Sequence, residues 1–258
     1  MKARALSRPP GRENTSSVGF GRVFALGVSL SACLFGAAQA QDNPLVPANQ
    51  DLTGVWWAST MPTGLKPMDG SAIPFTAEGR KKYAEVQAGL KSGKIVDRAR
   101  DICLPQGLPR AFATAYPIQV MTIPSQTVFF FEENRQVHHL KYAAKHNDPE
   151  FWDPSYMGDT IAHWEGDTLV ADTTNFNDES YLDPSGIPHS DKLRVGQRIR
   201  KINGGKQLEV VATIEDPDIF TKPWSARFVY DRRDDVRVAT DWVCGEPHRN
   251  VSDVKRVP

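Results

Sequence analysis

The sequence predicts a mainly β protein built around an antiparallel β-barrel, and two observations support this prediction. From Ile118 onward the chain consists of short apolar or alternating runs that are separated by turn residues. Some of these runs are joined by sequences typical of tight hairpins, namely Glu165-Gly166-Asp167 and Asn203-Gly204-Gly205-Lys206. Strands joined in this way must close on themselves or pair two sheets to protect their edges. We therefore expect a lipocalin-like barrel, with a β-sandwich as the alternative.

Residues 41–117 are expected to form an irregular segment that wraps the barrel and carries one helix. This segment is rich in Pro and Gly and holds one short strand, 54–58. The helix is predicted to begin after Thr76, whose side chain suits an N-cap, and to stop near Gly89 or Gly93. Three apolar residues at helical spacing are expected to face the rest of the domain: Tyr83, Val86 and Leu90.

Residues 118–258 are predicted to form the barrel itself, in one domain with the preceding segment. Their strands are expected at 118–123, 127–132, 136–142, 160–165, 168–173, 193–202, 207–214, 224–230 and 236–243. Almost no helical pattern interrupts them. A domain of this length can bury a substantial core.

Residues 1–40 look like an export signal. Basic residues precede the apolar run 23–37, which ends at the small-residue site Ala38-Gln39-Ala40. Cleavage there would leave 218 residues in the periplasm or outside the cell. A transmembrane anchor is disfavoured, because the apolar run is shorter than the roughly 20 residues that a spanning helix needs. A lipoprotein attached through Cys33 is a further alternative, since Leu30-Ser31-Ala32-Cys33 has the form of a lipid-attachment box.

The charge balance and motifs exclude several classes of function. Without residues 1–40, which carry five basic residues and one acidic residue, the chain has 26 basic and 30 acidic residues. This mildly acidic balance favours neither nucleic acid nor an anionic membrane surface as partner. A phosphate-binding loop, a dinucleotide fingerprint and a Gly-x-Ser-x-Gly elbow are all missing, so no cofactor is expected. Zinc-ligand spacing is missing too, and the sequence defines no oligomeric state.

Two cysteines, Cys103 and Cys244, remain after removal of the signal. In an oxidising compartment such a pair is expected to form a disulfide. A catalytic Cys103 with a His partner is the alternative, but a reactive thiol needs an electropositive setting that the sequence does not show.

Several phrases occur together in one order: Cys103-Leu104-Pro105, Trp164-Glu165-Gly166-Asp167, Asn175-Phe176-Asn177-Asp178, Gly186-Ile187-Pro188-His189 and Thr213-Ile214-Glu215-Asp216. Through these phrases the chain resembles a family of exported proteins from Gram-negative bacteria that has no settled activity. The resemblance spans nearly the whole mature chain and implies export and a single domain. The relatives tend to carry Glu where this chain has Gln197. If that Glu is a catalytic base in the family, Gln197 cannot replace it.

The stretch from Asp172 to Asp191 is the first candidate for chemistry. It gathers carboxylates, amides, hydroxyls and one His between two predicted strands, and it is far longer than the roughly two to five residues of a hairpin loop. His189 is the natural proton-transfer residue, with Asp191 as a possible orienting carboxylate and Asp172 as a polarising group. The alternative is that His189 and Ser190 merely cap a turn.

Five further residues are predicted to bind the substrate. Arg110 has the fork geometry that anchors a carboxylate or enolate. Asn177 and Tyr181 lie on the same polar loop, and His138 lies on a strand where it can face inward. Trp164 is a candidate lining residue for a cavity that holds a hydrophobic or aromatic ligand.

We therefore expect a periplasmic, cofactor-independent enzyme that performs acid/base chemistry on a small hydrophobic or aromatic molecule, as a lyase, hydratase or isomerase. The main alternative is a non-catalytic periplasmic binding protein for such a ligand, which would use the same cavity but would need no His. A structural envelope module is the third possibility, and it predicts an interior packed solid with aromatic side chains.

Overall fold

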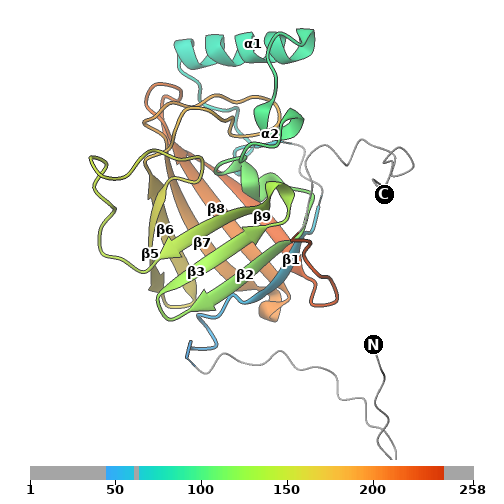
Figure 1. Cartoon of the computed structure of the whole chain (residues 1–258), viewed down its shortest axis with the longest axis vertical. Helices are drawn as coiled ribbons and strands as arrows, with labels where there is room; N and C mark the ends of the chain where they lie inside the picture. Colours follow the sequence, from blue (N-terminus) through green and yellow to red (C-terminus); the bar gives the residue numbers. More distant parts are fainter. Residues whose placement is uncertain (1–44, 61–63, 241–258) are drawn as a thin grey trace, which may run out of the picture. The chain divides into compact units, whose positions relative to one another are not determined.

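The alternating runs of the sequence form strands that close into a barrel (Figure 1). The computed structural model describes residues 45–60 and 64–240, and nine strands lie within them. The protein is thus mainly β, and the predicted lipocalin-like barrel is confirmed. The export signal with Cys33 and the predicted disulfide partner Cys244 lie outside the described residues, so cleavage, lipidation and the disulfide stay predictions.

The strands follow one another around the barrel in chain order. All neighbours pair antiparallel except β4 and β5, which share one parallel bridge between Lys141 and Ile161. A parallel pair needs a crossover connection, and residues 142–158 supply it. The strands are β1 Gly54–Ala58, β2 Ile118–Ile123, β3 Gln126–Phe131, β4 Gln136–Lys141, β5 Asp159–Glu165, β6 Thr168–Thr174, β7 Arg194–Ile202, β8 Gln207–Glu215 and β9 Trp224–Arg232.

The barrel is closed by β1, a strand from the segment that was expected only to wrap it. β1 pairs with β2 on one side and with β9 on the other. The predicted boundary at residue 118 therefore does not separate the barrel from its wrapping. The prediction of a strand at 236–243 is wrong for its described part, 236–240. Because β1 already occupies the free edge of β9, the sheet offers that segment no edge to pair with.

The predicted helix is α1, Ala77–Ser92, and its ends follow from the sequence. The Thr76 side chain caps the first turn by accepting a hydrogen bond from the Gly79 N–H, and Gly93 ends the helix in the left-handed conformation at φ 70°. Tyr83 stacks on Phe75 with ring centroids 5.2 Å apart. Shorter helical turns are α2 Arg98–Asp101, η1 Arg110–Ala113, η2 Glu133–Arg135 and η3 Asn203–Gly205, and η3 lies in the hairpin turn that the sequence predicted at 203–206.

Both α-helices lie at one end of the barrel, here called the α1 end (Figure 1). At this end Phe112 of η1 enters the core, where its ring contacts Phe129, Phe131 and Phe228. The Tyr230 hydroxyl donates to the Phe112 carbonyl oxygen. The core is therefore filled mainly by aromatic and aliphatic side chains. None of the helices in the described residues is both long and apolar enough to span a membrane.

Candidate functional site

The acidic loop between β6 and β7 is held in shape by its own carboxylates. Asp183 accepts hydrogen bonds from the N–H and the hydroxyl of Ser185, at 2.9 and 2.6 Å, and from the N–H of Leu65 at 2.9 Å. Asp216, from the loop between β8 and β9, accepts from the N–H and the hydroxyl of Ser190 at 2.6 and 2.9 Å. These bonds fix the backbone on both sides of His189, so the loop presents its histidine from a rigid support.

His189 is buried in this loop, with 8 % of its surface exposed. Its Nε2 lies 3.0 Å from the Ser180 hydroxyl oxygen, and its Nδ1 lies 3.1 Å from the carbonyl oxygen of Ser190. Burial lowers the pKa of His189 below its ordinary value, although the Ser190 carbonyl and two nearby acids oppose the shift. The ring is therefore neutral at pH 7.

The contacts of the ring determine which nitrogen carries the hydrogen. A carbonyl oxygen can only accept, so Nδ1 carries the hydrogen and donates it to Ser190. A neutral imidazole has one N–H, so Nε2 keeps a free lone pair. The Ser180 hydroxyl then donates to Nε2. The result is a base, His189 Nε2, that accepts from the Ser180 hydroxyl. Ser180 itself is partly exposed to solvent.

The predicted orienting residue, Asp191, is exposed and makes none of the hydrogen bonds described for His189. The Ser190 carbonyl takes the place that sequence reasoning gave to the Asp191 carboxylate. Ser180 was missed as the partner of His189, because a separation of nine residues within a loop follows no periodic rule.

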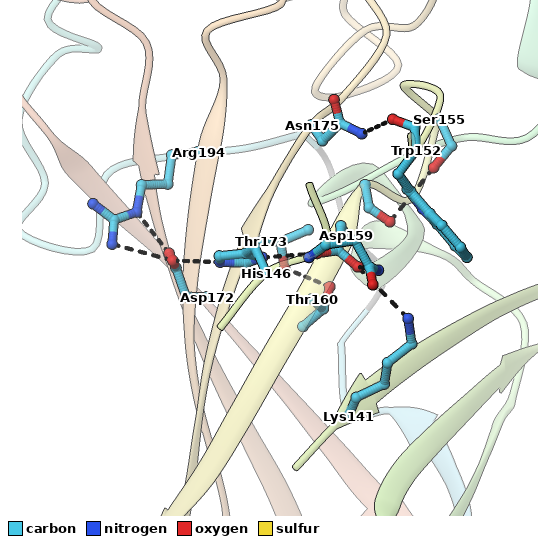
Figure 2. A network of polar contacts seen from close by, with 12 residues as sticks. Lys141, His146, Trp152, Ser155, Asp159, Thr160, Asp172, Thr173, Asn175 and Arg194 are labelled. Atoms are coloured by element: carbon cyan, nitrogen blue, oxygen red, sulfur yellow. Dashed lines mark hydrogen bonds and ion pairs between the residues drawn. The ribbon is translucent and has the colours of Figure 1, made fainter. Parts of the chain in front are cut away.

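Asp172 belongs to a different cluster, on the outer wall of the barrel (Figure 2). It lies on β6, where it pairs in register with Ile161 and Gly196. His146 of the crossover 142–158 bridges Asp172 and Asp159: its Nε2 is 2.9 Å from Asp172 Oδ2, and its Nδ1 is 3.0 Å from Asp159 Oδ2. We call these three residues the His146 bridge.

The His146 bridge is surrounded by further donors, as Figure 2 shows for two of them. Arg194 Nε donates to Asp172 Oδ1 at 2.6 Å, and Lys141 Nζ lies 3.6 Å from Asp159 Oδ1. Burial raises the pKa of both carboxyls, but hydrogen bonds outweigh it and the net pKa of each is lowered. Arg194 and His146 supply these bonds to Asp172, and Asn147 and His146 supply them to Asp159. The polar groups of the bridge therefore already satisfy one another through hydrogen bonds.

This bridge attaches the crossover to the wall, and the crossover in turn contacts the site loop. The Asn175 side-chain amide donates to the Trp152 carbonyl oxygen at 2.8 Å (Figure 2). The Asn177 N–H donates to the Ser155 carbonyl oxygen at 3.0 Å. Within the described ranges, no group of three or more His, Cys, Asp or Glu side chains is placed to hold a metal ion.

Arg110 is buried in an ion pair. Its two terminal nitrogens donate to the two carboxylate oxygens of Asp97, at 3.0 and 2.8 Å, and the two side chains are 5 % and 1 % exposed. Burial raises the pKa of Tyr181, and the charge of Asp97 adds to this rise while Arg110 opposes it. Asn177 accepts from the N–H of Glu179 at 3.4 Å, and Trp164 packs partly buried against the core. None of these predicted binding residues makes one of the described hydrogen bonds to His189.

His138 faces the barrel interior, where polar side chains interrupt the apolar core. Gln197 Nε2 lies 3.3 Å from His138 Nε2 and 3.0 Å from the Thr173 hydroxyl, which in turn contacts Thr160 at 2.9 Å. Burial lowers the pKa of His138 to about 3, so this ring is neutral as well. Gln197 Oε1 is buried and finds no partner among the described residues.

Two hollows among the described residues are small. One of about 80 Å³ is lined in part by Phe112, Phe228 and Tyr230, and one of about 220 Å³ is lined in part by Met68 and Trp224. Both lie below the roughly 300–1,000 Å³ typical of pockets for drug-sized ligands. Ser180 and His189 line neither hollow.

No family model and no curated protein sequence matches this chain. The resemblance to exported bacterial proteins therefore stays a prediction.

Proposed function

We propose that this protein is a periplasmic enzyme that performs acid/base chemistry without an organic cofactor, with His189 as the group that takes up and returns the proton. The observation that supports this proposal most is the hydrogen bond from Ser180 to His189 Nε2. The Ser190 carbonyl leaves the lone pair of the neutral imidazole on Nε2, and the hydroxyl of the partly exposed Ser180 donates to that lone pair.

The environment of His189 suits a general base. A base acts only in its unprotonated form, and burial keeps His189 unprotonated at pH 7. The Ser190 carbonyl fixes the tautomer, and Asp216 fixes Ser190. The ring therefore needs no rearrangement before it accepts a proton, which is the advantage of a preorganised catalytic group.

The surroundings favour a small hydrophobic or aromatic substrate, and the reaction class we propose is that of a lyase, hydratase or isomerase. Tyr181 is adjacent to Ser180 in the chain and is partly exposed, and the partly exposed Tyr156 donates its hydroxyl to Glu179 at 2.6 Å. Such side chains offer an apolar surface with a polar tip.

The test is turnover of small aromatic, terpenoid and sugar-derived molecules by the wild type and by His189→Gln, followed by mass spectrometry. The matched control is His139→Gln, because His139 is exposed on β4 and contacts only Gln126 among its described hydrogen bonds. We expect His189→Gln to lose about 100-fold or more in rate, the usual contribution of a general base, and the control to keep full activity. Equal activity of His189→Gln and the wild type would contradict the proposal.

A non-catalytic binding protein is the second candidate, and one observation favours it. Gln197 Oε1 lacks a partner in the barrel interior, although buried polar atoms are almost always bonded. A bound molecule with a donor group would supply that partner. Thermal stabilisation by one class of compound in both the wild type and His189→Gln, without turnover in either, would favour this candidate.

A further inference from the structure

Ser180 differs from the other serines of its loop in what its hydroxyl contacts. The hydroxyls of Ser185 and Ser190 donate to the carboxylates of Asp183 and Asp216, where they complete turns. The Ser180 hydroxyl instead contacts the imidazole of His189 at 3.0 Å. Among the described residues, no other His ring hydrogen-bonds to a hydroxyl.

The arrangement contains the three groups of an activated nucleophile: a hydroxyl, a base that contacts it, and a group that orients the base. A nucleophilic hydroxyl needs a base within about 2.6–3.2 Å, and that base must be oriented by a third group. Here the hydroxyl is Ser180, the base is His189 Nε2, and the third group is the Ser190 carbonyl at 3.1 Å from Nδ1. The third group is a neutral acceptor in place of the carboxylate of a Ser-His-Asp triad.

The position of the Ser180 hydroxyl is also restricted from the other side. Gly107 has φ 72°, and a Cβ at this position would lie 2.9 Å from Ser180 Oγ and 2.8 Å from the Tyr156 carbonyl oxygen. Only glycine allows the backbone to approach this closely in the left-handed region. The hydroxyl oxygen thus lies between the Gly107 backbone and the His189 ring.

We propose that Ser180 is a nucleophile that forms a covalent acyl-enzyme with small carboxylic esters, and that the protein hydrolyses them. This proposal rests on the proposed function in one respect, His189 as the base, and it goes beyond that function because ester cleavage by water would make the protein a hydrolase in place of a lyase, hydratase or isomerase. It adds the attacking atom, the bond that breaks and the substrate class.

The reaction balances without a redox partner. Ser180 Oγ forms a bond to the ester carbonyl carbon while its proton moves to His189 Nε2. The tetrahedral adduct then breaks its bond to the alkoxy oxygen, which leaves as an alcohol with the proton from Nε2. Water repeats the sequence: it loses a proton to Nε2, attacks the acyl carbon, and releases the carboxylic acid while the proton returns to Ser180 Oγ.

The test is labelling of the full chain with a fluorophosphonate, which reacts with activated serine hydroxyls, followed by peptide mapping. We expect one adduct, on Ser180, at a rate that falls about 100-fold or more in His189→Gln, as loss of a general base predicts. Ser180→Ala should give no adduct. Ser180→Cys is the second variant, and its thiol should react with iodoacetamide faster when His189 is present than in the Ser180→Cys, His189→Gln double variant.

The outcomes separate this proposal from the proposed function. An adduct on Ser180 that depends on His189, together with hydrolysis of p-nitrophenyl acetate that Ser180→Ala lacks, would support the nucleophile. If Ser180 gives no adduct while Ser180→Ala keeps a turnover that depends on His189, the nucleophile is refuted and the acid/base function stands. Without an adduct and without any effect of His189→Gln, both are refuted. An adduct that forms equally fast in His189→Gln would refute the pairing of the two residues.

Discussion

Replacing Arg110 by Met should cost the folded state about 3–5 kcal/mol, because it leaves the Asp97 carboxylate buried without its partner. The ion pair is bidentate, and the two side chains are 5 % and 1 % exposed. For a chain of this size each kcal/mol lowers the unfolding midpoint by about 2–4 °C, so the expected fall is about 6–20 °C. The matched control is Arg98→Met, whose ion pair with Glu179 is 47 % exposed on both sides. This exposed pair should contribute little, and the control should keep nearly the wild-type midpoint.

The assay is urea and thermal unfolding of these variants and of the Arg110→Met, Asp97→Asn double variant. Asn at position 97 removes the charge but keeps a side-chain oxygen, which can still cap α2 as Asp97 does through the Arg100 N–H. The double variant should therefore be more stable than the sum of the single costs predicts, by about 1–3 kcal/mol. If Arg110→Met lowers the free energy of unfolding no more than Arg98→Met does, the Arg110 guanidinium does not form a stabilising buried ion pair. It would then be available to anchor a substrate.

Two further predictions concern histidines. Stability should be highest above pH 6.5, because burial lowers the pKa of both His138 and His189 in the folded state. On acidification the unfolded chain takes up protons at these two residues first. The free energy of unfolding should therefore fall by up to about 1.4 kcal/mol per pH unit for each ring. The slope between pH 6.5 and 4 should decrease in His138→Gln, and a slope unchanged from the wild type would contradict the burial of a neutral ring. His146→Ala should cost about 1–3 kcal/mol and speed amide exchange in 142–158, since it removes both bonds of the His146 bridge. His163→Ala, an exposed His, should leave exchange in the crossover unchanged.

Local patterns predicted most strands, because alternation and tight turns are properties of neighbouring residues. The role of β1 was not predictable in this way. Its partners, β2 and β9, lie far away in the sequence, and its pattern says only that it is a strand. The segment 236–243 has a similar pattern, yet its described part forms no strand. Which of two strand-like segments closes the barrel depends on long-range strand pairing, which a local pattern does not contain.

The position of the proton-transfer residue was predictable from composition, since His189 stands in a long polar loop. Its partners were not, because the turns that bring Ser180 and the Ser190 carbonyl to the ring depend on Asp183 and Asp216. The outward position of Asp172 was not predictable either, because the apolar run Leu169-Val170-Ala171 covers both faces of β6. In the structure Leu169, Ala171 and Thr173 are buried, and Asp172 faces out of the barrel.

The most direct test of this account is the protonation state of His189, measured by nitrogen-15 NMR of the imidazole at pH 7. This measurement needs no knowledge of the substrate. The account predicts a neutral ring with the hydrogen on Nδ1 and an unprotonated Nε2 that accepts from the Ser180 hydroxyl, as the contacts to Ser190 and Ser180 require. His189→Gln assigns the signals by removing them. A charged imidazolium, or a neutral ring with the hydrogen on Nε2, would leave no base for the Ser180 hydroxyl and would contradict the account.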